Sequence, residues 1–232
     1  MAEVEIGIYK SARQAYGFDD IAIVPSRRTR DPEDVDISWQ IDAYKFELPV
    51  LGAAMDGAIS PATAIELGRL GGLGLLNLEG LWTRYEDPTP LFDEIRDLDD
   101  DKATARMQQM YLEPVKLELV AERIRQLKDA GIVTAASVTP QRTEWMAKTI
   151  MDSGLHILVI QGTVVSAEHV SKTSEPLNLK RFIREYDIPV IVGGCASYQA
   201  ALHLMRTGAV GVLVGVGPGH ACTTRGVLGI GV

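Results

Sequence analysis

Short apolar segments alternate with longer amphipathic segments along most of this 232-residue chain. Each apolar segment is only a few residues long and is bounded by Gly, Pro or Ser, which is typical of a buried strand. The intervening segments repeat their apolar residues with the period of a helix. This alternation predicts a parallel α/β sheet. The predicted strands are residues 49–54, 73–76, 134–138, 156–160, 189–192 and 210–214, and the predicted helices are residues 60–70, 91–98, 115–130, 142–153, 177–186 and 198–207.

The first strand–helix–strand repeat has clear boundaries. Ser60 is a good N-cap for the helix that follows, and Pro61 suits its first helical position. Gly71 and Gly72 end this helix before the next strand begins. Such a β-α-β unit implies parallel pairing of its two strands. Residues 1–47, by contrast, show no helical period.

The charge and cysteine content exclude several classes of protein. The net charge of −8 argues against a general nucleic-acid surface, which needs clustered Lys and Arg. Two cysteines are too few for a disulfide framework, which favours a reducing compartment. The apolar runs are far shorter than the ~20 residues that span a bilayer, and the first residues do not resemble a signal peptide. We therefore expect a cytoplasmic protein that binds neither nucleic acid nor a membrane.

The last predicted strand leads into a glycine-rich loop that contains one cysteine, Cys222. Gly215, Gly217 and Gly219 leave backbone amides and carbonyls open to the close approach of a phosphate or a cation. A strand followed by a loop that presents a thiol suits a nucleophile in an α/β enzyme. The alternative interpretation is a simple turn with an inert, buried cysteine.

Four sequence blocks resemble the IMP dehydrogenase / GMP reductase family. Residues 215–225 (GVGPGHACTTR) resemble the catalytic loop of that family, and residues 16–25 (YGFDDIAIVP) resemble its N-terminal segment. Residues 48–56 (LPVLGAAMD) and 71–77 (GGLGLLN) resemble its first two barrel strands. The blocks occur in the family's order and together extend over nearly the whole chain. The resemblance implies a (β/α)₈ TIM barrel instead of a doubly wound sheet.

Six predicted strands are two fewer than a complete barrel contains, and a barrel typically needs ~250 residues. We therefore expect residues 1–232 to form a single barrel catalytic domain that is incomplete and truncated at its C-terminal end. IMP dehydrogenases usually carry a pair of regulatory CBS modules within the barrel. The region between Asn77 and Ile132 has a helical pattern that leaves no room for them, so we expect no CBS domain.

The resemblance also implies a function. Cys222 would be the nucleophile that attacks purine C2, with hydride exchange with a nicotinamide cofactor, NAD or NADP(H). Thr224 matches a family threonine that activates the attacking or departing group, although it could also be an ordinary loop hydroxyl. The substrate would be a purine nucleoside monophosphate (IMP, GMP or XMP), and the family implies a homo-oligomer, either a tetramer or an octamer. The expected substrate contacts are Met55, Gly217, Gly219 and His220.

The remaining expected site residues concern the cofactor and a cation. The cofactor positions by resemblance are Gln161, Gly162, Thr163 and Gly194. Gly217, Gly219 and the carbonyl of Cys222 match positions that bind a monovalent cation in many IMP dehydrogenases. Hard oxygen ligands suit potassium there.

Four positions depart from the family pattern. His220 replaces a phosphate-binding Ser, Gln161 replaces an Asp, Gly194 replaces an Asn, and Ala53 replaces another phosphate-binding Ser. A purine-nucleotide oxidoreductase could work as a dehydrogenase or as a reductase. A binding or regulatory relative without turnover is the first alternative. A different barrel enzyme with a coincidental thiol is the second.

Overall fold

The structure of the chain is a computed structural model, which describes residues 3–13, 16, 20–25, 27–167, 176–217, 219 and 222–231. The chain divides into two compact units. We call Ile37–Val214 the barrel unit, and Met1–Asp36 together with Gly215–Val232 the terminal unit.

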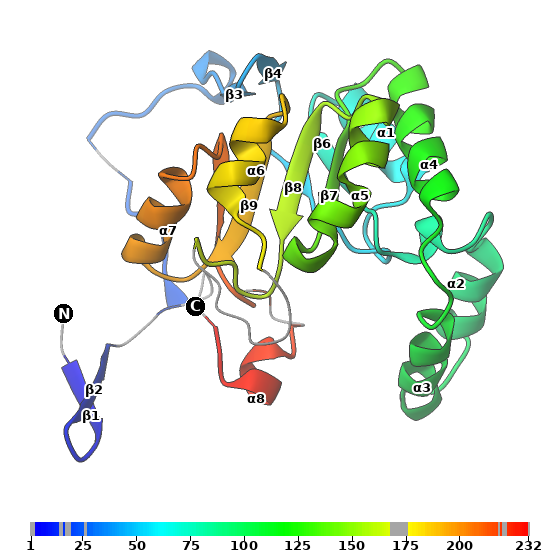
Figure 1. Cartoon of the computed structure of the whole chain (residues 1–232). Helices are drawn as coiled ribbons and strands as arrows, with labels where there is room; N and C mark the ends of the chain where they lie inside the picture. The colour runs from blue at the N-terminus through cyan, green and yellow to red at the C-terminus, as the bar shows by residue number, and fades with distance from the viewer. Residues whose placement is uncertain are drawn as a thin grey trace. The chain divides into compact units, whose positions relative to one another are not determined.

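The described residues of the barrel unit form one six-stranded parallel sheet (Figure 1). Its strands are β5 (Leu51–Gly52), β6 (Leu73–Asn77), β7 (Ala135–Val138), β8 (Ile157–Gln161), β9 (Val190–Cys195) and β10 (Gly211–Val214). Their order in space is their order in the chain, whereas a doubly wound sheet reverses its strand order at a switch point. The sheet curls into a half-barrel, and the expected fold class, an incomplete (β/α)₈ barrel, is confirmed.

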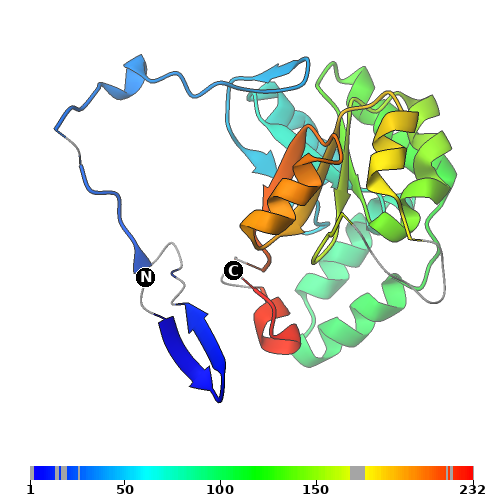
Figure 2. The same cartoon turned by 60° about the vertical axis from the view of Figure 1, so that its left-hand side comes forward.

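Most helices of the barrel unit cover the outer face of this sheet in both views (Figures 1 and 2). Ser60 caps α1 as predicted, because its side chain accepts a hydrogen bond from the amide of Thr63. Pro140 begins its helix two residues earlier than predicted, since it suits the first helical position. The helices that follow the strands are α1 (Pro61–Arg69), α4 (Leu117–Asp129), α5 (Pro140–Ser153), α6 (Leu179–Glu185) and α7 (Tyr198–Met205).

Strand side chains alternate between the two faces of the sheet. In β8, Leu158 and Ile160 pack against the helices, while Ile157 and Val159 face the concave side, the interior of the barrel. Both sets are fully buried, which explains why the strand is apolar throughout instead of alternating with polar residues.

A short antiparallel hairpin, β3 (Trp39–Ile41) and β4 (Tyr44–Phe46), packs on the concave face. Ile41 and Phe46 are buried there with Leu73 and Ile157, which lie at the beginnings of their strands. The hairpin therefore covers the N-terminal end of the barrel interior. Its three-residue strands were too short to be predicted from sequence.

A helical insertion separates β6 from α4. It contains the 3₁₀ helix η3 (Leu81–Thr83), α2 (Thr89–Arg96) and α3 (Asp100–Met110). The helices α2 and α3 pack on each other on the side of the sheet where the strands end (Figure 1). Only the first of these two helices was predicted.

The described part of the terminal unit contains little regular structure. An antiparallel hairpin, β1 (Glu3–Gly7) and β2 (Lys10–Arg13), is followed by the 3₁₀ helix η2 (Pro32–Asp34). The short helix α8 (Thr224–Leu228) follows the glycine-rich loop. In the described part of either unit, no helix has both the length and the apolar composition to span a membrane.

Candidate active site

The strands of the six-stranded sheet all run in the same direction, so the loops that follow them meet at one edge of the sheet. In β6, β7, β8 and β9, the last residue that faces the concave side of the sheet comes two residues after a buried residue of the barrel interior. Asn77 and Ser137 are register partners on β6 and β7, and Gln161 and Gly193 are partners on β8 and β9. The apolar interior thus changes to polar residues and glycine at this edge, which we call the mouth.

Three of the expected cofactor positions lie beside one another at the mouth. The amide of Gly162 donates to the carbonyl of Gly193 over 3.0 Å, and the amide of Gly194 donates to the carbonyl of Gly162 over 3.1 Å. These bonds extend the pairing of β8 with β9 and bring Gly162 and Gly194 together. Gln161 is half-buried, and the fourth position, Thr163, is exposed in the same loop.

Gly193 has no room for a side chain. A Cβ atom there would lie 2.4 Å from Cβ of Leu213 and 2.7 Å from its carbonyl oxygen. The close approach of β9 to β10 therefore requires glycine at this position.

Met55, an expected substrate contact, is exposed in the loop after β5. The side chain of its neighbour Asp56 forms hydrogen bonds at the mouth. Oδ2 of Asp56 accepts hydrogen bonds from the amide of Leu81 over 2.7 Å and from the hydroxyl of Tyr111 over 2.5 Å. Oδ1 is buried against Gly80, where a Cβ atom would lie 1.9 Å from it. Burial raises the pKa of Tyr111, and the hydrogen bond to Asp56 raises it further, so this hydroxyl remains a donor.

Glu79 connects the loops after β6 and β7. Its Oε2 accepts a hydrogen bond from the amide of Thr139 over 2.6 Å, and its own amide donates to Oδ1 of Asn77 over 3.0 Å. Arg84 donates to the carbonyl of Glu79 over 3.1 Å and to the carbonyl of Tyr111 over 3.1 Å. The loops after β5, β6 and β7 are therefore held together by hydrogen bonds that sequence reasoning did not identify.

Cys222 and Thr224, the expected catalytic pair, are adjacent in the terminal unit. The Cys222 thiol donates to Oγ1 of Thr224 over 3.2 Å, and Cys222 is exposed. Gly217 has a φ of 57° and packs against both residues. A Cβ atom on Gly217 would lie 3.3 Å from Sγ of Cys222 and 3.1 Å from Cβ of Thr224, so glycine allows the loop to close on the thiol.

The rest of the glycine-rich loop is only partly described. The amide of Cys222 donates to the carbonyl of Gly219 over 3.0 Å. His220, the expected phosphate contact, lies outside the described residues. The expected site residues thus form two groups, one at the mouth of the barrel unit and one around Cys222 in the terminal unit.

Comparison with known proteins gives the family. The IMP dehydrogenase / GMP reductase domain matches residues 15–232. An uncharacterized oxidoreductase of Mycobacterium tuberculosis is 47% identical over 99% of this chain and 63% of its own length. An inosine-5'-monophosphate dehydrogenase of Methanocaldococcus jannaschii is 24% identical over 95% of this chain and 62% of its own length.

A solved structure supports the same relationship. The crystal structure of an IMP dehydrogenase/GMP reductase-like protein from Corynebacterium glutamicum superposes with a TM-score of 0.90 at 45% identity. The match covers 98% of this chain and 60% of that protein, so the chain spans about three-fifths of the length of these relatives. The chain belongs to the IMP dehydrogenase / GMP reductase family.

Proposed function

We propose that the protein carrying this chain is a purine-nucleotide oxidoreductase that converts IMP to XMP or GMP to IMP, with Cys222 as the nucleophile. The observation that carries the proposal is the exposed thiol of Cys222, which is hydrogen-bonded to Thr224 over 3.2 Å. A structural cysteine is normally buried among apolar side chains, as Cys195 is here. Family membership and the naming of the mycobacterial relatives as oxidoreductases agree with redox chemistry.

The thiolate of Cys222 would form a bond to C2 of the purine. In the direction from IMP to XMP, a hydride then leaves C2, and water later displaces the sulfur. In the direction from GMP to IMP, the C2 amino group leaves as ammonia, C2 then receives a hydride, and the thiolate of Cys222 leaves C2. Sulfur suits both directions because a thiolate is a good nucleophile and a good leaving group. Oγ1 of Thr224 is within hydrogen-bond distance of Sγ, so its hydroxyl can take part in moving the proton that the thiol loses.

A nicotinamide cofactor, NAD or NADP(H), would accept or supply the hydride. Gln161, Gly162, Thr163 and Gly194 are the residues proposed to hold it. Their chemistry fits a neutral, amide-bearing ring, because the Gln161 side chain can both donate and accept hydrogen bonds. The amides of Gly162 and Gly194 already donate hydrogen bonds to backbone carbonyls. The side chains of Gln161 and Thr163 would therefore make the polar contacts with the cofactor.

The substrate phosphate and a potassium ion would bind at the glycine-rich loop. We propose that Met55, Gly217, Gly219 and His220 contact the nucleotide. The carbonyls of Gly217, Gly219 and Cys222 would be ligands for potassium. The Gly219 carbonyl accepts the amide of Cys222 and retains a second lone pair for an ion.

We propose a cytoplasmic homo-oligomer, a tetramer or octamer, that binds neither nucleic acid nor a membrane. The barrel would form one catalytic domain without CBS modules. The region between β6 and β7, where such modules would be inserted, contains η3, α2, α3 and α4 instead.

A second function, nucleotide binding without turnover, is supported by Gln161 and Gly194. These positions replace the carboxylate and the amide that the family usually has beside the cofactor. With neither group present, an intact nucleotide pocket could serve a regulatory role.

One assay distinguishes the two functions. The complete polypeptide that carries residues 1–232 is supplied with IMP plus NAD and, separately, with GMP plus NADPH, while nicotinamide absorbance is followed. Turnover of either pair supports the oxidoreductase and gives its direction. Tight binding of IMP or GMP by calorimetry without turnover of either pair supports the binding protein and refutes the enzyme.

A further inference from the structure

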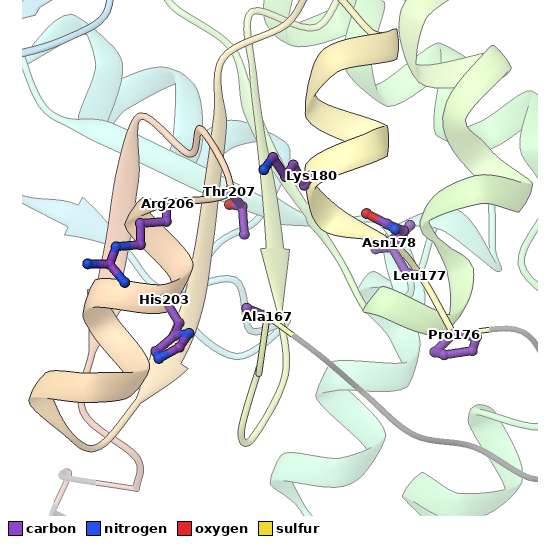
Figure 3. Close-up of a pocket in the computed structure, with 8 residues that line it drawn as sticks. All are labelled: Ala167, Pro176, Leu177, Asn178, Lys180, His203, Arg206 and Thr207. Carbon is purple, nitrogen blue, oxygen red and sulfur yellow. The ribbon is translucent and has the colours of Figure 1, made fainter.

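A groove in the barrel unit, lined by none of the expected site residues, has the properties of a second ligand site. It lies between α6 and α7 and has a volume of about 410 Å³ (Figure 3), within the range of small-molecule pockets. Its described lining residues are Ala167, Pro176, Leu177, Asn178, Lys180, His203, Arg206 and Thr207.

The polar atoms that the groove offers are mainly donors. Asn178 caps α6, and its Oδ1 accepts the amide of Arg181 over 2.9 Å, which leaves its NH₂ group to donate. Lys180 and Arg206 can only donate. The hydroxyl of Thr207 donates to the carbonyl of Leu204 over 2.6 Å, so its side chain is fixed in the groove wall.

Positive charge in this groove is not neutralised by the described side chains. No Asp or Glu occurs among the described lining residues. Several exposed cations elsewhere have an acidic partner, for example Lys148 with Asp152 and Arg181 with Glu144. Within the described part of the chain, neither Lys180 nor Arg206 forms such a pair.

The side chains that carry this charge come from both helices. Figure 3 shows Lys180 extending from α6 towards Thr207, with His203 and Arg206 on the α7 side. The guanidinium of Arg206 points away from Lys180 in this view. Because the side chain of Arg206 is exposed, changes of rotamer alone can bring it towards the groove. Ala167, Pro176 and Leu177 add an apolar part to the lining.

We propose that this groove binds the phosphate group of a small phosphorylated molecule. Lys180 and Arg206 neutralise the phosphate charge, Asn178 and His203 contribute further hydrogen bonds, and the apolar residues contact the organic part. Charge-assisted hydrogen bonds from Lys and Arg are the strongest contacts that a phosphate makes with side chains. Free phosphate shares this chemistry, and the experiment distinguishes it from an organic phosphate.

The test follows the ring signals of His203 by NMR in the complete polypeptide that carries this chain. His203→Gln identifies those signals, which separates this groove from any nucleotide site near Cys222. The probes are inorganic phosphate, glucose 6-phosphate and glucose, with sodium chloride at matched ionic strength. The test variant is Lys180→Gln/Arg206→Gln, and the control is Arg125→Gln/Lys148→Gln, which removes two exposed charges from α4 and α5.

We expect both phosphates, but neither glucose nor chloride, to shift the His203 signals. The Lys180→Gln/Arg206→Gln variant should bind about tenfold more weakly or worse, because it loses two charge-assisted contacts, and the control should bind as the wild type does. Tighter binding of glucose 6-phosphate identifies an organic phosphate as the ligand, and equal binding identifies free phosphate. Equal shifts with chloride, or unchanged affinity in the test variant with an unchanged melting temperature, would overturn the proposal.

Discussion

The hydroxyl of Tyr111 donates to Oδ2 of Asp56 across 55 positions of sequence. The bond joins the end of α3 to the loop after β5. Asp56 also accepts the amide of Leu81, so one carboxylate connects three separate segments at the mouth. The arrangement of these loops therefore depends on Tyr111, a residue at the end of the helical insertion.

Replacing Tyr111 with Phe should destabilise the barrel unit. The substitution removes a hydrogen bond to a carboxylate, which is worth about 1.5–3 kcal/mol. In a chain of this size each kcal/mol lowers the melting temperature by about 2–4 °C. Thermal melting followed by circular dichroism measures the loss. Tyr198→Phe, at an exposed tyrosine, is the control, and equal melting of the two variants would show that the Asp56 bond contributes nothing.

Gly80→Ala should be more harmful than an ordinary Gly→Ala change. The new Cβ atom would lie 1.9 Å from Oδ1 of Asp56, and that carboxylate cannot move without losing its bonds to Leu81 and Tyr111. We expect a loss of about 1–3 kcal/mol in urea denaturation. Gly57→Ala, which places its Cβ in open space, is the matched control. Equal midpoints for the two variants would contradict the packing described here.

His156 should make stability depend on pH in the mildly acidic range. Its Nδ1 accepts the amide of Thr134 over 3.0 Å, and burial, followed by the nearby charge of Lys128, lowers its pKa. The unfolded state therefore takes up a proton first, near the usual histidine pKa of ~6.5. The contribution of His156 to stability is complete above that pH and is lost as the pH falls towards the pKa of His156 in the folded state.

The measurement is urea denaturation at several pH values between 7.5 and 5. His156→Gln should have a flatter pH dependence than the wild type, and His203→Gln controls for the removal of a histidine. Carboxylates with lowered pKa values, such as Asp87 and Glu94, change their charge below this pH range and so do not alter the measured pH dependence. The same slope in His156→Gln and in the wild type would exclude this role for His156.

The sequence predicts those parts of the fold that depend on local pattern. Ser60 and Pro61 mark the start of α1 because capping is a contact between neighbours in the chain. β8 was predictable because its residues are buried on both faces. The β3–β4 hairpin was not, since Ile41 and Phe46 are buried by strands that come later in the chain.

The candidate site was likewise predictable only where it depends on local sequence pattern. Gln161 and Gly194 could be expected close together because parallel strands end at one edge. The bonds from Tyr111 to Asp56 and from Arg84 to the carbonyl of Tyr111 could not be identified, because they span 55 and 27 positions and only the folded helical insertion forms them. Cys222 was identified from a short motif, and its contact with Thr224 spans only two residues.

The two cysteines should differ in reactivity. Cys222 is exposed, whereas Cys195 is 1% exposed beneath the helices. Iodoacetamide should therefore alkylate Cys222 first, and bound IMP or GMP should slow that reaction. Peptide mass spectrometry over a time course measures both rates. Faster labelling of Cys195, or no effect of either nucleotide, would argue against Cys222 as the residue that meets the purine.

The turnover of Cys222→Ala, measured in the complete polypeptide that carries this chain, tests whether Cys222 is the nucleophile. The variant should lose all measurable turnover with IMP plus NAD and with GMP plus NADPH. Its melting temperature should stay within a few degrees of the wild type, because Cys222 is exposed. Cys195→Ala removes the other thiol and should retain activity. Full activity in Cys222→Ala would contradict the assignment of this thiol.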